Sequence, residues 1–355
     1  MRTSVLAPLA CALVLLAVDA QAQTAEKIRI GFLTDMSSVF ADIDGKNGAV
    51  AIQMAIDDFG GKVLGRPIEL LSADHQNKAD IGAGSPALTN EQCSPYTVHY
   101  AFDTVALSRG TGTAVVAGGG KNWYFLTADY VFGHSLEGDT SKVVQGSGGS
   151  VAGAVRHPLN ASDFSSFLMQ AQNSKAQILG LATAGTDAHN AIKAAREFGI
   201  TRSMKMAALM FFNTDVHALG MKNTEGLLFT TSWDWSLSEA SRGFGQKFFA
   251  KTKRMPSDLQ AADYSATMNY LKAVQAAGTT DADAVMAKLK GTPIDDFYAK
   301  GQIRPDGRFV HDMYLMQVKA PAESKEPWDY LKLVKQLPGE EVFTRKAESR
   351  CALWQ

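Results

Sequence analysis

Short apolar segments with strand character alternate with amphipathic helical segments along most of the chain, and this alternation constrains the fold more than any other feature. Residues 28–33 are apolar and bounded by charged and turn residues, and residues 49–59 follow with apolar side chains at helical spacing. Gly60 and Gly61 end that segment as a helix C-cap would. Strands that alternate with helices form parallel sheets covered by helices, so we predict an α/β fold.

The same alternation continues through the rest of the chain, which is long enough for two domains. Further strands are expected at 68–72, 123–127, 151–156, 177–182, 205–210 and 226–231. Further helices are expected at 135–145, 163–172, 187–198, 261–277 and 282–290. Residues 301–318 indicate a hairpin that turns at Pro305, Asp306 and Gly307.

The N-terminus has the pattern of a cleaved export signal. Arg2 provides the positive charge, residues 5–18 are apolar, and Ala20-Gln21-Ala22 is the small-x-small pattern that signal peptidase requires. We predict a signal peptide over 1–22 and a periplasmic mature protein. Cys11 lies inside the apolar run without a hydrophobic stretch before it, which argues against lipidation.

Charge and cysteine content narrow the function further. The formal net charge of −1 gives no sign of binding to nucleic acid or to an anionic membrane. Removal of the signal peptide leaves two cysteines, Cys93 and Cys351, and an even number in an oxidising compartment favours a disulfide. Two separate buried thiols are the alternative.

Candidate catalytic motifs fail on their spacing. Gly133-His134-Ser135 resembles a nucleophile elbow, but Glu137 stands where that motif needs glycine. Gly110-Thr111-Gly112 and Gly118-Gly119-Gly120 do not make the dinucleotide fingerprint. The seven histidines form no H-E-x-x-H pattern and no pairing with cysteine at metal spacing. We therefore expect no catalytic residues, no metal and no cofactor.

Polar and aromatic residues gather directly after the expected strands. In open α/β sheets, ligands bind outside the carboxyl ends of the strands. Such loops follow five expected strands, and one alone would be an ordinary connection; they are 35–40, 129–133, 183–186, 211–215 and 233–235. Together they predict a ligand cleft between two sheets.

Three segments carry a resemblance to a known family: KIRIGFLTDMSSVFADIDGKNGAVAIQMAIDDFGG, AGSPALT and WYFLTADYVFGHSLE. They resemble the type I periplasmic binding proteins for branched-chain amino acids, and most of all the branch that takes up aromatic carboxylates. The resemblance implies two Rossmann-like lobes joined by three crossing segments, with the ligand between them. It also implies delivery of the ligand to a permease in the inner membrane, driven by a cytoplasmic ATPase. We expect a monomer.

The resemblance also implies domain boundaries and site residues. The first lobe is expected to comprise 23–102 and 233–309, the second 103–232 and 310–341, followed by a tail at 342–355. The loop of Ala83, Gly84 and Ser85 would bind the ligand carboxylate. Ala184 and Gly185 lie where amino-acid binders can carry tyrosine, and Asp215 lies near an acidic residue that pairs an ammonium group. The full set of expected ligand-binding residues is Ser37, Ser38, Phe40, Ala83, Gly84, Ser85, Tyr130, Ala184, Gly185, Phe212, Asp215, Trp233 and Tyr264.

The chain departs from the family between Gly82 and Ala83. The family has a helix, a strand ending in Ser-Ser or Ser-Ala, and another helix and strand there, so roughly one βαβ unit of about 30 to 40 residues is absent. That unit carries another hydroxyl for the ligand carboxylate. A natural deletion, a damaged gene and an assembly error are all open explanations. We expect weakened ligand binding and a first lobe that is rearranged or partly unfolded.

The function that follows is capture of a small carboxylate by hinge closure, as the substrate-binding component of an ABC importer. The ligand would be a branched-chain or aromatic amino acid or an aromatic acid. Two alternatives stay open: a periplasmic ligand-binding sensor module and an exported enzyme.

Overall fold

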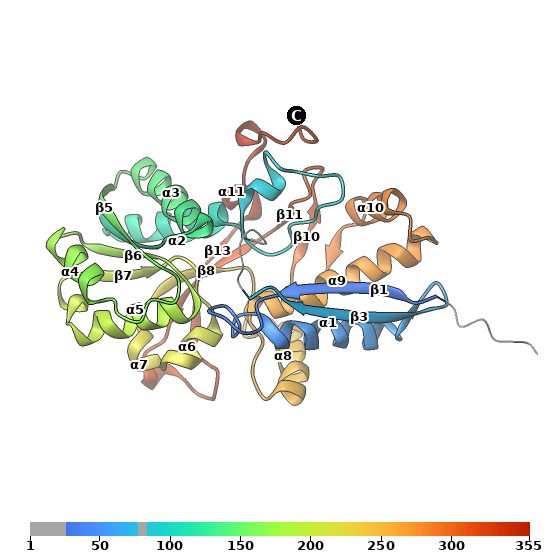
Figure 1. Ribbon diagram of the computed structural model, residues 1–355, viewed down its shortest axis with the longest axis horizontal. Helices are drawn as coiled ribbons and strands as arrows, with labels where there is room; N and C mark the ends of the chain where they lie inside the picture. Colours follow the sequence, from blue (N-terminus) through green and yellow to red (C-terminus); the bar gives the residue numbers. More distant parts are fainter. Residues whose placement is uncertain (1–25, 77–83) are drawn as a thin grey trace, which may run out of the picture.

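The computed structural model describes residues 26–76 and 84–355, which form two α/β lobes side by side (Figure 1). The expected signal peptide, Ala83 and the junction after Gly82 lie outside the described residues. We call the lobe that contains β1 to β3, α1, α8 to α10 and β9 to β11 the first lobe. The remaining strands, together with α2 to α7 and α11, make up the second lobe.

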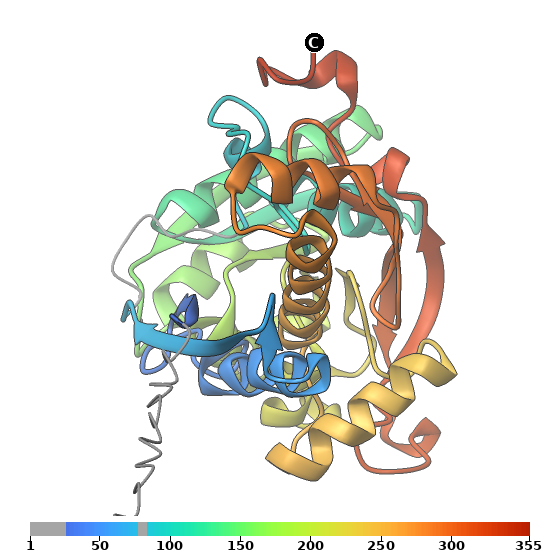
Figure 2. The ribbon, with the colours of Figure 1, turned by 90° about the vertical axis from the view of Figure 1, so that its right-hand side faces the viewer.

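The first lobe is built on a small sheet of order β1-β3-β2. Its elements are β1 (Ile28–Thr34), β2 (Lys62–Val63), β3 (Arg66–Asp74), α1 (Gly45–Phe59), α8 (Glu239–Thr252), α9 (Asp258–Ala277), α10 (Ala282–Gly291), β9 (Ile294–Asp295), β10 (Lys300–Ile303) and β11 (Phe309–His311). Strands β1 and β3 are parallel, with Ile28 opposite Ile68. Helix α9 lies between α1 and α10 (Figure 2). Ile52 and Ile56 of α1 are buried, and the alternate residues of β1 pack against the same core.

The second lobe contains a seven-stranded sheet of order β13-β12-β8-β7-β6-β4-β5. Its strands are β4 (Asn122–Ala128), β5 (Ser150–His157), β6 (Ile178–Ala182), β7 (Lys205–Ala208), β8 (Leu228–Thr231), β12 (Met313–Val318) and β13 (Leu331–Leu337). Its helices are α2 (Thr104–Ala117), α3 (Val131–Gly146), α4 (Ser165–Asn173), α5 (Gly185–Glu197), α6 (Asn213–Leu219), α7 (Met221–Thr224) and α11 (Gly339–Val342). Strands β4 to β8 pair in parallel, whereas β12 and β13 pair antiparallel. The α/β class predicted from the alternation is confirmed.

Several elements differ from the sequence prediction, among them helix α8 and strand β13, which were not predicted. Helix α2 was not predicted, because its glycines and threonines give no amphipathic pattern. Gly110 in this helix lies against β8, where an added Cβ would come within 2.3 Å of the Thr230 hydroxyl oxygen, so the glycine serves close helix packing. The predicted 301–318 hairpin is only partly correct. β10 and β11 pair around the expected turn, but β12 leaves that sheet and pairs with β8 and β13 in the second lobe.

The first-lobe sheet is open on one edge and one face. Among the described residues, β1 pairs with β3 alone. Leu33 and Leu71 point away from the helices and are 48% and 49% exposed. Two exposed leucines and an edge strand without a second partner fit a missing βαβ unit, although the same face also carries the ion-paired Arg29 and Glu69.

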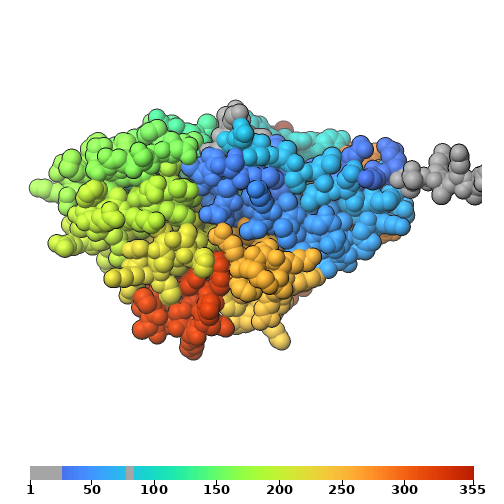
Figure 3. All heavy atoms as spheres, turned by 60° about the horizontal axis from the view of Figure 1, so that its bottom comes forward, coloured from blue at the N-terminus to red at the C-terminus, as the bar shows by residue number. Residues whose placement is uncertain are grey.

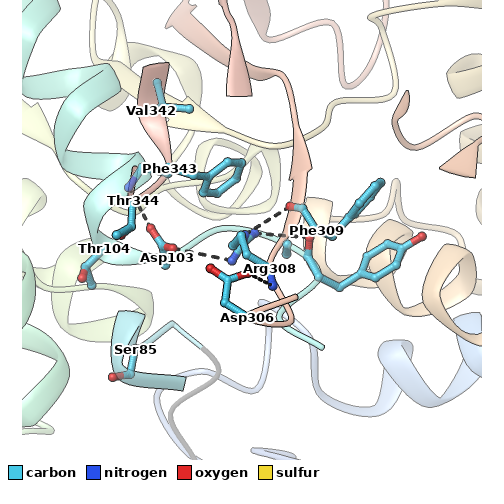
Figure 4. A network of polar contacts seen from close by, with 12 residues as sticks. Ser85, Asp103, Thr104, Asp306, Arg308, Phe309, Val342, Phe343 and Thr344 are labelled. Carbon is cyan, nitrogen blue, oxygen red and sulfur yellow. Dashed lines mark hydrogen bonds and ion pairs between the residues drawn. The ribbon is translucent and has the colours of Figure 1, made fainter. Parts of the chain in front are cut away.

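The chain passes between the lobes near residues 102–104, 231–239 and 311–313, and a buried polar network lies at these passages (Figure 4). Asp103 caps α2 by accepting a hydrogen bond from the Ala106 N–H, and its other oxygen lies 3.7 Å from Arg308 Nη1. Arg308 also donates to the Tyr100 carbonyl, and its guanidinium lies over the Phe343 ring. Burial lowers the pKa of Arg308 to about 10, so it stays charged at neutral pH.

The C-terminal tail spans both lobes on the outside of this network. A disulfide joins Cys351 to Cys93, which lies in the segment that leads into the first passage. Arg109 of α2 donates to both carboxylate oxygens of Glu348, at 2.8 and 2.7 Å, and to the Phe343 carbonyl. The tail is therefore tied covalently to the 84–95 segment and by charged hydrogen bonds to the second lobe.

The open sheet predicts unequal protection of the lobes in hydrogen exchange. Amides of β1 and β3 should exchange faster than those of β4 and β6, because the first sheet has three strands and one uncovered face, whereas β4 and β6 each lie between two partner strands. Exchange followed by mass spectrometry on the purified chain measures this. Equal protection of the amides in both sheets would show that the open edge and face of the first-lobe sheet are covered in solution.

The disulfide predicts that the exported protein carries no free thiol. Intact mass after alkylation under non-reducing conditions should show no adduct, and reduction should add two. A bridge closing this long loop stabilises by about 4–5 kcal/mol in the chain-entropy model, so Cys93→Ser should lower the melting temperature. Two alkylated thiols without reduction would contradict the pairing.

Candidate ligand-binding cleft

The loop after β1 is held rigid by one buried carboxylate. Asp35 Oδ1 accepts hydrogen bonds from the N–H groups of Ser37 and Ser38, at 3.2 and 2.8 Å, and Oδ2 accepts one from Phe40, at 3.0 Å. Ser37 donates its hydroxyl to Asp74. The loop thus places the Phe40 ring toward the second lobe, while the Ser37 hydroxyl is used within the first lobe.

Aromatic rings from both lobes form a continuous apolar wall. The Phe40 ring lies 6.4 Å from that of Tyr130, and Tyr130 lies 6.1 Å from Phe132. Phe132 packs against Gly84, where an added Cβ would come within 2.8 Å of the ring. On the other side of Gly84, Phe102 lies 5.8 Å from Phe212.

The structure therefore brings together Phe40, Gly84, Tyr130 and Phe212 of the predicted residues. The sequence reasoning missed Phe102 and Phe132. Phe132 could have been chosen, because it lies two residues after Tyr130 in a loop already considered. Phe102 had no such signal, because it precedes α2, which was not predicted.

Asp215 is engaged entirely by its own lobe. Its Oδ2 accepts the Phe212 N–H at 2.8 Å, and its Oδ1 lies 2.7 Å from His189 Nε2. The Asp215 side chain is buried. Because this carboxylate is buried and each oxygen already accepts one hydrogen bond within its own lobe, it is a less favourable partner for a ligand ammonium group.

Polar groups that could bind a ligand remain at the same edge of the second-lobe sheet. The hydroxyls of Thr183 and Thr214 are buried without a hydrogen-bond partner among the described residues. Thr183 follows β6, and Thr214 lies in the first turn of α6. A buried hydroxyl without a partner is costly, so both are candidate donors to a ligand. Ser85, which was predicted for this role, accepts the Ala87 N–H at 3.3 Å, and its own O–H can still donate to a ligand.

Two predicted residues lie in the core of the first lobe. Trp233 donates from its indole nitrogen to Ser241 and to the Phe297 carbonyl, both at 3.2 Å. Tyr264 donates its hydroxyl to Asp58 at 2.6 Å, and its ring packs on Phe244. Both side chains are used in packing this lobe, and we leave them out of the proposed site.

A groove of about 540 Å³ lies outside this wall. It runs between residues 86–91, helices α2 and α3, and the C-terminal tail, and none of the predicted ligand residues lines it. Its main charges pair with one another, Arg109 with Glu348 and Arg350 with Glu91. We assign no ligand to it. The described residues hold no cluster of three or more metal-ligating side chains, and none of their helices has the length and hydropathy needed to cross a bilayer.

The comparisons with known proteins agree with this geometry. The family described as "Periplasmic binding protein" matches residues 27–85 and 81–325, so the chain belongs to this family. The two matched segments overlap at 81–85, the place where the sequence predicted the loss of a βαβ unit. No match was found among the curated proteins.

Solved structures extend the match to almost the whole chain. A periplasmic binding protein from Burkholderia mallei is 59% identical, with a TM-score of 0.90 over 93% of this chain and 99% of the other. A branched-chain amino acid ABC transporter periplasmic ligand-binding protein from Burkholderia xenovorans is 33% identical, with a TM-score of 0.81 over 92% and 100%. A solute-binding protein from R. palustris in complex with benzoate is 16% identical, with a TM-score of 0.80 over 92% and 100%, and shows the shared fold.

A buried carboxyl group at the second passage predicts a pH dependence of stability. Burial raises the pKa of Asp258 to about 6, although Thr231 and Ser232 donate hydrogen bonds to it. The native group therefore binds a proton that the unfolded chain has lost, and its contribution to stability falls as pH rises from about 4 to about 6.

The variant Asp258→Asn should remove this contribution. The difference in free energy of unfolding between the natural chain and the variant should change by roughly 2–3 kcal/mol between pH 4 and pH 7. Urea unfolding at a series of pH values measures it. A difference that does not vary with pH would show that Asp258 is not protonated in the native state.

Proposed function

We propose that this chain is the substrate-binding component of an ABC importer, and that it closes two lobes around a small carboxylate with an aromatic body. The observation that carries the proposal is the aromatic wall of Phe40, Tyr130, Phe132, Phe102 and Phe212. Pockets for small molecules are mostly apolar with a few placed polar groups, and the wall with Thr183 and Thr214 has this character.

The state of Asp215 favours an aromatic acid over an amino acid. An amino acid carries an ammonium group that needs an acidic or carbonyl partner, and the Asp215 carboxylate is already occupied by His189 and the Phe212 N–H. Gly185 contributes no side chain to that wall. The benzoate-bound protein from R. palustris shows that this fold can bind an aromatic acid.

The chain would act in the periplasm without catalysis and would present its closed form to a membrane permease. The expected export signal and membership of the family support this location. A ligand-binding sensor module is the second candidate, because the same clamp can serve a signalling partner. Transport in cells that lack only this protein would separate the two functions.

A thermal-shift panel, followed by calorimetry, tests the ligand class. Benzoate and hydroxybenzoates should raise the melting temperature more than Leu, Ile, Val or Phe. Because the resemblance implies the loss of one hydroxyl to the carboxylate, we expect binding about tenfold to hundredfold weaker than in an intact relative.

Tyr130→Ala should weaken binding of an aromatic acid by about tenfold, because the ring loses one apolar contact surface. Tyr270→Ala, on the outer side of α9, is the matched control and should bind as the natural chain does. A sugar or a metal ion as the only ligand would overturn the assignment.

A further inference from the structure

The first lobe touches the N-terminus of α5 through backbone alone. The Thr186 N–H donates to the Val39 carbonyl at 3.1 Å. Gly185 lies directly beside this contact, with a left-handed φ of 58°. A Cβ at Gly185 would come within 2.1 Å of the Val39 carbonyl oxygen and 3.2 Å of the Phe40 ring. The absence of a side chain at residue 185 is therefore what allows the lobes to meet here.

The Val39 carbonyl is presented by a rigid loop. Asp35 accepts hydrogen bonds from the N–H groups of Ser37 and Ser38, just before Val39, and of Phe40, just after it. The far end of the loop is anchored at the Ile43 carbonyl, which accepts hydrogen bonds from Ser257 and Gln260. Val39 itself is 4% exposed. Moving this loop away from an added side chain on the second lobe would therefore break several of these hydrogen bonds.

The Val39 carbonyl is a favourable acceptor for an N–H group at the N-terminus of α5. The first N–H groups of a helix have no partner within the helix and carry partial positive charge, and α5 extends for 13 residues. A second hydrogen bond also joins the two lobes: Asn213 donates from its side-chain nitrogen to the Pro256 carbonyl of the first lobe at 3.0 Å. Figure 3 shows blue atoms of the first lobe directly against green and yellow atoms of the second lobe.

We propose that the Val39 carbonyl, the Thr186 N–H and the bare Gly185 form a closing latch that stabilises the closed lobes independently of the ligand. This inference rests on the proposed function, since it concerns the closing step of the same cleft. No ligand atom takes part in the latch, so it adds the same free energy to the closed state whichever ligand is bound. Loss of the latch should weaken all ligands by one common factor.

Gly185→Ala tests the latch, and Gly226→Ala is its matched control. Gly226 also has a left-handed φ, of 80°, but a Cβ there meets nothing within 4 Å. Both variants place alanine at a left-handed φ, and only Gly185→Ala adds a Cβ that meets the other lobe. We expect Gly185→Ala to weaken benzoate and any second ligand by the same factor, about tenfold or more, while Gly226→Ala binds like the natural chain.

A second variant separates closure from misfolding. Thr186→Pro removes the N–H donor in the first turn of α5 without adding a Cβ at residue 185. It should reproduce the common loss of affinity. Small-angle X-ray scattering without ligand should show both variants with a larger radius of gyration than the natural chain and Gly226→Ala.

The possible results of these experiments test the latch and the proposed function separately. Equal affinity and equal radius of gyration in Gly185→Ala and Gly226→Ala would overturn the latch. Unequal losses among ligands would also overturn it, because they would make residue 185 part of the pocket wall. If the natural chain binds no carboxylate, the proposed function fails, and the scattering comparison still tests the latch.

Discussion

Parallel strands end at one edge of their sheet, and this constraint determines where the site can be. The loops after β1, β4, β6 and β7 all leave from such edges, and the two lobes turn these edges toward each other. Phe40, Tyr130, Gly185 and Phe212 come from these four loops. The position of the site therefore depends less on any single side chain than on the two sheets, whose strands point their carboxyl ends toward each other.

Much of this arrangement could be predicted from the sequence, because it depends on local patterns. The alternation of strands and helices gave the α/β class, and the position of loops after strands pointed to Phe40, Tyr130 and Phe212. What could not be predicted depends on tertiary packing. Trp233 and Tyr264 have the residue types of a ligand wall, but their polar atoms find partners inside the first lobe.

Asp215 and Gly185 are two residues of the site whose roles also could not be predicted, because they depend on tertiary packing. The sequence places a carboxylate near the cleft, but only the structure shows that His189 and a backbone N–H occupy both of its oxygens. A glycine at residue 185 suggested only a missing tyrosine. Its role in lobe contact depends on the position of the Val39 carbonyl, which belongs to a segment about 150 residues away and has no local signal.

The three-stranded first sheet gives the first lobe less support than the second lobe has. The second lobe has a seven-stranded sheet and its own core, whereas the first lobe depends on α1 and α9 for cover and leaves Leu33 and Leu71 in water. Domain stability is only about 5–15 kcal/mol, so an uncovered face is a substantial loss. The first lobe therefore depends more on contacts outside its own core for its stability. These contacts include the Cys93–Cys351 bridge and the hydrogen bonds between the lobes.

The central claim is that this chain is a clamp that captures a small aromatic carboxylate and releases it unchanged. The most direct measurement is mass spectrometry of the small molecules released when the periplasmically expressed protein is purified and denatured. The account predicts an aromatic acid, present at a fraction of the protein concentration and chemically intact after incubation with the native chain. Release of a sugar, or conversion of the bound compound into a product, would contradict it.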